Sequence, residues 1–151
     1  MEQTIIKRLN YYYYGIMALA LVVALACYFL IVKGIVPAID PQSTLGSTIQ
    51  NIIICDLLLT LPGGLYWHKR VCNRLSAEQD AEKQALGYER SARRRILLVS
   101  NTMVLAIAAF YLMGAYRSML WVAAIAAIGW YFTKPTEGKI QQELLPPTEN
   151  Y

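Results

Sequence analysis

Residues 11–32 read YYYYGIMALALVVALACYFLIV, a stretch that contains no Asp, Glu, Lys or Arg. An apolar run of about 20 residues is long enough to cross the hydrocarbon core of a bilayer as a single α-helix. Lys7 and Arg8 precede the run and Lys33 follows it, so charged residues mark both of its boundaries. We therefore predict a transmembrane helix over residues 11–32.

The same stretch also has features of a cleavable signal peptide. A basic start precedes the apolar run, and Ala24-Leu25-Ala26 followed by Cys27 has the small residues of a cleavage site. The run nevertheless stays apolar through Val32, whereas a cleaved signal turns polar after its cleavage site. We therefore favour a retained helix over a cleaved signal.

Three further apolar segments follow, at residues 47–67, 96–116 and 118–133. The chain is 56% hydrophobic and 16% charged, whereas soluble domains have about 45–50% apolar and about 25% charged residues. We predict an all-α integral membrane protein in which residues 1–135 form one domain, a four-helix bundle of two antiparallel transmembrane hairpins. A polar cytoplasmic tail follows at residues 136–151.

A charged segment at residues 68–95 separates the second apolar segment from the third and holds eight Lys and Arg against four Asp and Glu. Ser76 and Gln79 have the spacing of a capping box, in which a hydroxyl caps the first turn of a helix. We predict a cytoplasmic helical loop, with a helix that starts at about Ala77, loosens at Gly87 and runs into the third span.

Basic residues predict the orientation, because the cytoplasmic flanks of transmembrane helices carry an excess of Lys and Arg. With the amino terminus inside, 12 of the 14 Lys and Arg are cytoplasmic, and only Lys33 and Arg117 are external. We therefore expect both termini on the cytoplasmic side of the cell membrane.

An arginine cluster, Arg90, Arg93, Arg94 and Arg95, lies directly before the third span. Basic clusters at this position attract anionic lipid head groups, at about 1 kcal/mol per residue. They also fix the topology, and the two roles are compatible. We predict that these arginines contact the anionic head groups of the lipid bilayer.

Asp56 is the ionisable residue deepest inside a predicted span. Carboxylates in this environment usually face a helix interface or a water-filled cavity. One interpretation is a proton or cation site. The other is a neutral side chain that joins helices by hydrogen bonds, with Asn51 and Thr60 one turn away as candidate partners. The sequence leaves both interpretations open.

Pro62, Gly63 and Gly64 lie in the inner third of the same span. Proline removes one backbone hydrogen bond and glycine adds conformational freedom, so we expect a kink here. This kink is either a hinge that moves or a fixed bend.

Residues that bind metals or carry out catalysis are scarce. Cys27, Cys55 and Cys72 form no C-x-x-C pair, and their odd number argues against a disulfide framework. His68 is the only histidine, and we interpret it as a residue of the membrane interface because usual zinc sites need more ligands of this kind. We expect no catalytic residues, no metal and no cofactor.

The net charge of +4 does not predict a nucleic-acid-binding protein, because no recognition motif accompanies it. Ala20 and Ala24, like Ala123 and Ala127, have the four-residue spacing that lets helices approach closely. We predict a non-enzymatic scaffold or accessory subunit that binds another membrane protein or a second copy of itself. The alternatives are a small oligomeric transporter or channel that uses Asp56, and a membrane-embedded enzyme acting on lipid or quinone.

Overall fold

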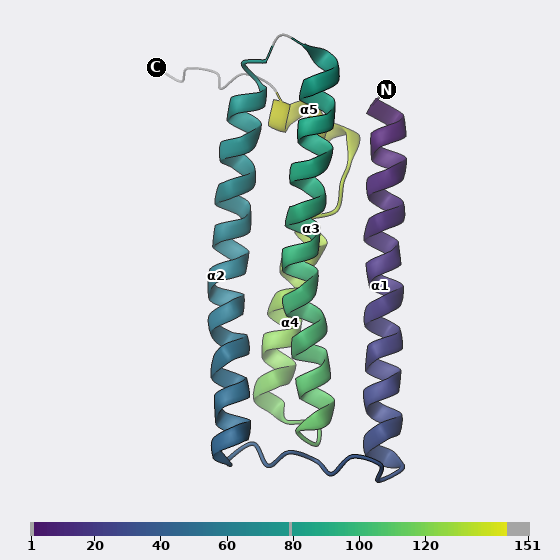
Figure 1. Cartoon of the computed structure of the whole chain (residues 1–151), viewed down its shortest axis with the longest axis vertical. Coiled ribbons are helices and arrows are strands. Elements are labelled where there is room, and N and C mark those ends of the chain that lie inside the picture. The colour runs from purple at the N-terminus through teal and green to yellow at the C-terminus, as the bar shows by residue number, and fades with distance from the viewer. Residues whose placement is uncertain (1, 79, 145–151) are drawn as a thin grey trace.

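The computed structural model of the chain describes residues 2–78 and 80–144, and the regular structure in these ranges is entirely helical. Three long helices and a shorter fourth lie side by side, and a short fifth helix lies across one end of them (Figure 1). The all-α prediction is therefore confirmed for the described residues. The helices are α1 (Glu2–Val32), α2 (Thr44–Leu75), α3 (Ala81–Leu112), α4 (Arg117–Phe132) and α5 (Glu137–Leu144).

Helix α3 is the centre of the arrangement, because it packs against α1, α2 and α4. Helices α1 and α2 lie on opposite sides of it (Figure 1), and within the described chain they do not pack against each other. The predicted hairpin of the first two spans is therefore wrong as a packed unit, although the two helices are antiparallel. Within the described residues, α2 packs against α3 and α3 packs against α4, so each of these two pairs of consecutive helices forms a packed hairpin.

The main core lies between α3, α4 and the middle of α2, and several of its members are small. Ala106, Ala126 and the larger Met119 belong to this core and are completely buried. A second cluster, which includes Leu9, Tyr88 and Ile96, joins the start of α1 to the start of α3. Small residues let the backbones approach closely, which suits helices with little polar surface between them.

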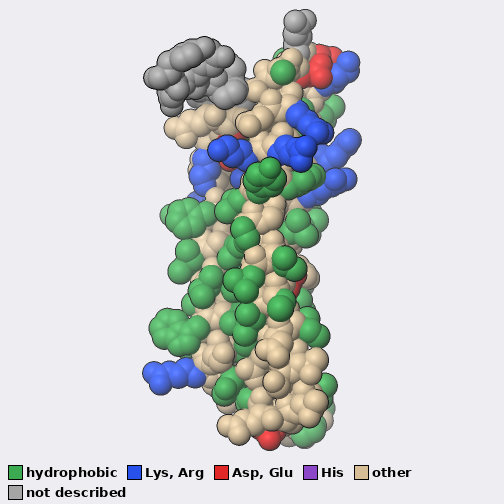
Figure 2. Space-filling view, turned by 90° about the vertical axis from the view of Figure 1, so that its left-hand side faces the viewer, with side chains coloured by type: hydrophobic (Ala, Val, Ile, Leu, Met, Phe, Trp, Pro, Cys, Tyr) green, Lys and Arg blue, Asp and Glu red, His purple; other side chains and the backbone are tan. Residues whose placement is uncertain are grey.

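Helices α1, α2 and α3 are long and apolar enough to cross a membrane, and α4 is a shorter apolar helix. Figure 2 shows hydrophobic side chains over the long middle of one face, with most Lys and Arg side chains gathered towards one end. We call this end, formed by the start of α1, the end of α2, the start of α3 and α5, the basic end (Figure 1).

The charged segment at the basic end differs from its prediction. Helix α2 continues to Leu75 and ends at Ser76, so Ser76 is a carboxyl-terminal cap and does not start a helix. Helix α3 starts after Asp80, whose carboxylate accepts hydrogen bonds from the backbone N–H groups of Glu82 and Lys83. Asp80 therefore replaces the expected capping box, since a carboxylate satisfies free N–H groups well. The other member of that box, Gln79, lies outside the described residues.

Gly87 does not loosen α3, which is continuous through this position. A Cβ atom there would lie 2.6 Å from Cδ2 of Leu75 at the end of α2. The glycine therefore allows the two helices to pack closely at the basic end.

Candidate functional site

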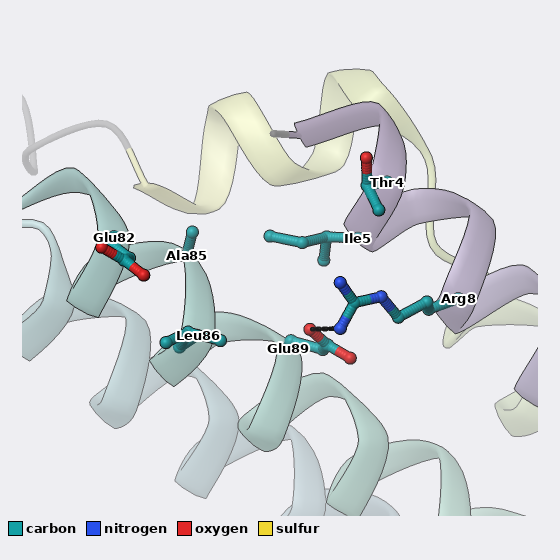
Figure 3. Close-up of a pocket in the computed structure, with 7 residues that line it drawn as sticks. All are labelled: Thr4, Ile5, Arg8, Glu82, Ala85, Leu86 and Glu89. Carbon is teal, nitrogen blue, oxygen red and sulfur yellow. Dashed lines mark ion pairs between the residues drawn. The ribbon is translucent and has the colours of Figure 1, made fainter.

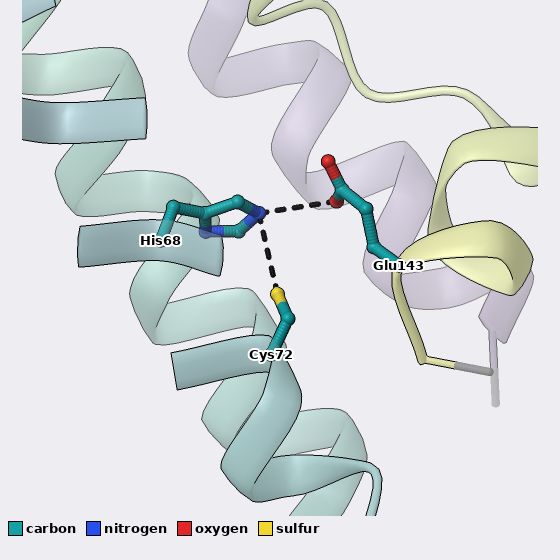
Figure 4. Close-up of side chains that lie close together, drawn as sticks. All are labelled: His68, Cys72 and Glu143. Carbon is teal, nitrogen blue, oxygen red and sulfur yellow. Dashed lines mark hydrogen bonds and ion pairs between the residues drawn. The ribbon is translucent and has the colours of Figure 1, made fainter. Parts of the chain in front are cut away.

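The basic end contains a buried group of polar side chains that comes from three helices. His68 and Cys72 are four residues apart on α2 and so lie on one face of it, each only 2% exposed. Glu143 of α5 points towards them (Figure 4). The Nε2 atom of His68 is 3.1 Å from Oε2 of Glu143 and 3.5 Å from Sγ of Cys72.

Three side chains of α3 form hydrogen bonds with Glu143 and His68. The hydroxyl of Tyr88 donates to Oε2 of Glu143 at 2.6 Å, and Nη1 of Arg95 donates to Oε1 at 3.2 Å. Oγ of Ser91 is 2.8 Å from Nδ1 of His68. These three residues are three or four positions apart, so one face of α3 presents them all. Both carboxylate oxygens and both imidazole nitrogens are therefore engaged.

The surroundings determine the charge of Glu143. Burial alone would raise the pKa of its carboxyl, but the hydrogen bonds from His68 and Tyr88 and the charge of Arg95 outweigh burial and lower this pKa to about 2. The carboxylate is therefore ionised at neutral pH. It lies on α5, beyond all four apolar segments.

The pKa of the Cys72 thiol shifts in the opposite direction. This residue lies beyond the apolar segment 47–67. Burial, together with the negative charge of Glu143, raises the pKa of its thiol to about 11. The thiol is therefore protonated at neutral pH, and without a ligand it has little nucleophilic character.

The group offers three kinds of metal-binding atom, an imidazole nitrogen, a sulfur and a carboxylate oxygen, and all lie within 4.8 Å of one another. The interpretation of His68 as an interfacial residue is wrong, since its side chain is buried between helices. The four-residue spacing of His68 and Cys72 in the sequence indicates that these two potential ligands share one face of a helix. Glu143 could not be added to it, because it lies 75 positions from His68 in the sequence.

Asp56 lies between α2 and α3. Thr60 donates a hydrogen bond to one of its carboxylate oxygens at 3.2 Å, and Thr102 of α3 donates to the other at 2.5 Å. Thr60 was among the predicted partners, whereas Asn51 lies exposed on α2 and outside this group of hydrogen bonds. The arrangement joins the two helices, as expected of a polar group that holds an interface together.

The Pro62-Gly63-Gly64 segment lies within α2, which is helical from Thr44 to Leu75 without interruption. The ribbon of α2 shows no sharp bend in the view of Figure 1. Gly64 is buried and Gly63 is exposed. Movement at this segment stays a prediction.

The arginine cluster divides into surface and interior residues. The side chain of Arg95 is only 5% exposed and is paired with Glu143, so the prediction that it contacts lipid head groups is not supported. Arg90 is exposed, Arg93 pairs with Glu89 at 3.2 Å, and the guanidinium of Arg94 lies 5.8 Å from the ring centre of Trp67. Arg90, Arg93 and Arg94 therefore remain available at the surface.

A separate pocket of about 270 Å³ lies between α1 and α3 at the basic end (Figure 3). Apolar side chains such as Ile5 and Ala85 line part of it. Arg8 of α1 lies across it from Glu89 of α3, at 3.7 Å. The side chain of Arg8 is 59% exposed, so this ion pair contributes little to stability.

Comparison of the chain with protein-family models, with curated proteins and with solved structures finds no match.

Proposed function

We propose that the chain is a four-span integral membrane protein with no enzymatic activity, a scaffold or accessory subunit that holds the transmembrane helix of a partner protein. The apolar surfaces of α1, α2 and α3 support a place in the bilayer. The basic end suits the cytoplasmic side, with both termini there. Exposed Arg90 and Arg94 suit contact with anionic lipid head groups at this boundary.

The proposed binding site is an apolar groove of about 340 Å³ on the membrane-facing part of the bundle. Helix α1 forms one side, α4 forms the other, and α3 lies between them. Towards the basic end, Tyr13 of α1 and Trp130 of α4 stack with ring centres 4.0 Å apart and join the two sides. The residues that line the groove carry no formal charge: Met17, Ala20, Leu21, Ala24, Met103, Ile107, Ala127, Trp130 and Tyr131.

The weak embedding of α1 is the observation that carries this proposal. Only 6% of its most apolar segment is buried within the chain, against 44% for α3. Ala24 on α1 and Ala127 on α4 line the groove and are only partly buried, and small residues let another helix approach closely. The groove therefore suits a helix from another protein.

A second copy of the chain fits this groove less well. A symmetric dimer places the same surface on both subunits against itself. Two concave grooves that face each other would leave both unfilled, so we commit to a helix of a different protein.

Photo-crosslinking in intact membranes tests this assignment. A photoreactive amino acid at Ala24 should give one discrete adduct with an identified membrane protein in a fixed ratio. The same amino acid at Val22, which is 61% exposed on the same helix, should not. Ala127→Trp, at a partly buried position that lines the groove, should abolish the adduct because the indole fills the groove.

Two outcomes would refute the assignment: equal, diffuse labelling from positions 22 and 24, or an adduct made of two copies of the chain. The second outcome would instead identify a homodimer.

A small oligomeric transporter or channel is the alternative function. It would require Asp56 to exchange protons or cations, whereas both of its carboxylate oxygens already accept hydrogen bonds from threonine hydroxyls. This arrangement supports a structural role for Asp56 more than a transport role.

A further inference from the structure

We propose that His68, Cys72 and Glu143 bind one divalent transition-metal ion, with zinc as the expected metal. The ligands are a neutral imidazole, a thiolate and a carboxylate, which are the three side-chain types that zinc takes in proteins. Calcium and magnesium prefer oxygen ligands alone, so the sulfur and nitrogen select against them.

Two of the three distances between the ligand atoms match those around a tetrahedral ion, and the third, from sulfur to carboxylate oxygen, is at most 4.8 Å. Bonds of about 2.0–2.3 Å at tetrahedral angles separate nitrogen from sulfur by about 3.5 Å and nitrogen from oxygen by about 3.3 Å. The corresponding distances are 3.5 Å from Nε2 of His68 to Sγ of Cys72 and 3.1 Å from Nε2 to Oε2 of Glu143. An ion therefore fits with small side-chain movements, and water completes the fourth position.

The residues around the three ligands strengthen this assignment. Ser91 contacts Nδ1 of His68, which leaves Nε2 for the metal, and Arg95 holds the carboxylate oxygen that faces away from the histidine. Outer hydrogen bonds of this kind orient metal ligands, and their loss typically weakens binding about 10–100-fold. Surface clusters of ionisable groups lack such buried support.

Charge is the main opposing factor, because Arg95 lies beside the site. The thiolate and the carboxylate supply two negative charges against the two of the ion, which leaves the positive charge of Arg95 in excess. Binding replaces the S–H bond of Cys72 with a sulfur–metal bond and releases one proton to solvent. The bound ion would link α5 to the end of α2.

Cobalt(II) is a suitable probe, because it occupies zinc sites and absorbs light according to its ligands. The full-length protein in detergent should bind one Co²⁺ per chain, with a near-ultraviolet band from sulfur-to-metal charge transfer, and Zn²⁺ should displace it. Cys72→Ser should abolish the band. Cys55→Ser, which changes an exposed cysteine elsewhere on α2, should leave it unchanged.

Two further variants test the carboxylate ligand and the hydrogen bond that orients it. Glu143→Gln should weaken Co²⁺ binding at least tenfold, and Tyr88→Phe, which keeps every ligand, should weaken it by about 10–100-fold. Circular dichroism would confirm that each variant keeps its helix content. The proposal is overturned if the wild-type protein shows no saturable thiolate band, or if Cys72→Ser and Cys55→Ser bind Co²⁺ alike. The wild-type measurement decides alone if a variant fails to fold.

Discussion

Replacing Glu143 with glutamine should release α5 from the bundle. Oε2 of Glu143 accepts hydrogen bonds from both His68 and Tyr88, and Oε1 accepts one from Arg95. An amide has a single acceptor oxygen, so its NH₂ group would face donors at one of these positions. The substitution also leaves Arg95, with a side chain 5% exposed, without its paired charge.

The size of this effect follows from the burial of the pair. Breaking a fully buried ion pair costs about 3–5 kcal/mol. Glu143 is 27% exposed, so solvent reduces this cost to about 2–3 kcal/mol. Because about 1.4 kcal/mol corresponds to a tenfold change in an equilibrium, α5 should detach about 30–150 times more often.

Reactivity of Cys72 with a maleimide reports this detachment, because its side chain is 2% exposed beside Glu143. The measurement is made with a chelator present, in a background where Cys27 and Cys55 are serine. Glu143→Gln should increase the labelling rate by the factor given above. The matched control is Glu137→Gln, an exposed position on the same helix, which should leave the rate unchanged. Equal labelling rates in the two variants would show that Glu143 does not hold α5 in place.

Three further predictions follow from the same structure. The pKa of the Glu143 carboxyl is about 2, against a usual 4.5, so the ionised carboxylate stabilises docked α5 fully above pH 4.5, and docking should weaken as the pH falls from 4.5 towards 2. The emission of a fluorescent label on α5 would follow this detachment. Docking that is unchanged at pH 2 would contradict the prediction. Asp56→Asn should leave ion flux in proteoliposomes absent, as in the wild type, whereas wild-type flux that the variant loses would favour a transporter. Gly46→Ala should lower the free energy of unfolding by about 1–3 kcal/mol, because the added Cβ would lie 2.2 Å from the backbone oxygen of Asp40. The control is Gly63→Ala, whose Cβ would meet no atom within 4 Å, so this change should be neutral or stabilising. Thermal unfolding in detergent compares the two glycine variants, and equal melting temperatures would argue against the contact at Gly46.

The sequence predicted the helices better than their contacts. Length and charge boundaries located the apolar parts of α1 to α4, because a helix that satisfies its own backbone needs no distant partner. The start of α3 was wrong because Ser76 and Asp80 are both good capping residues, and local rules do not choose between them.

The site at the basic end could be predicted only in part. The spacing of His68 and Cys72 was visible in the sequence, but their third neighbour comes from α5, and the folding of the tail brings it there. The same folding separates Arg95 from the other arginines, since its partner Glu143 lies 48 positions away. Four neighbouring arginines look equivalent until the location of α5 is known.

The central position of α3 has a consequence for biogenesis. The ribosome releases α1 and α2 first, yet these two helices are native neighbours of α3 and not of each other. In the proposed bilayer location, each of them would have only lipid or insertion factors beside it until α3 is synthesised. The native interfaces of the first half of the chain therefore form only once the second half is being synthesised. Given the proposed place in the bilayer, a chain truncated near residue 80 should be a substrate for membrane quality-control proteases.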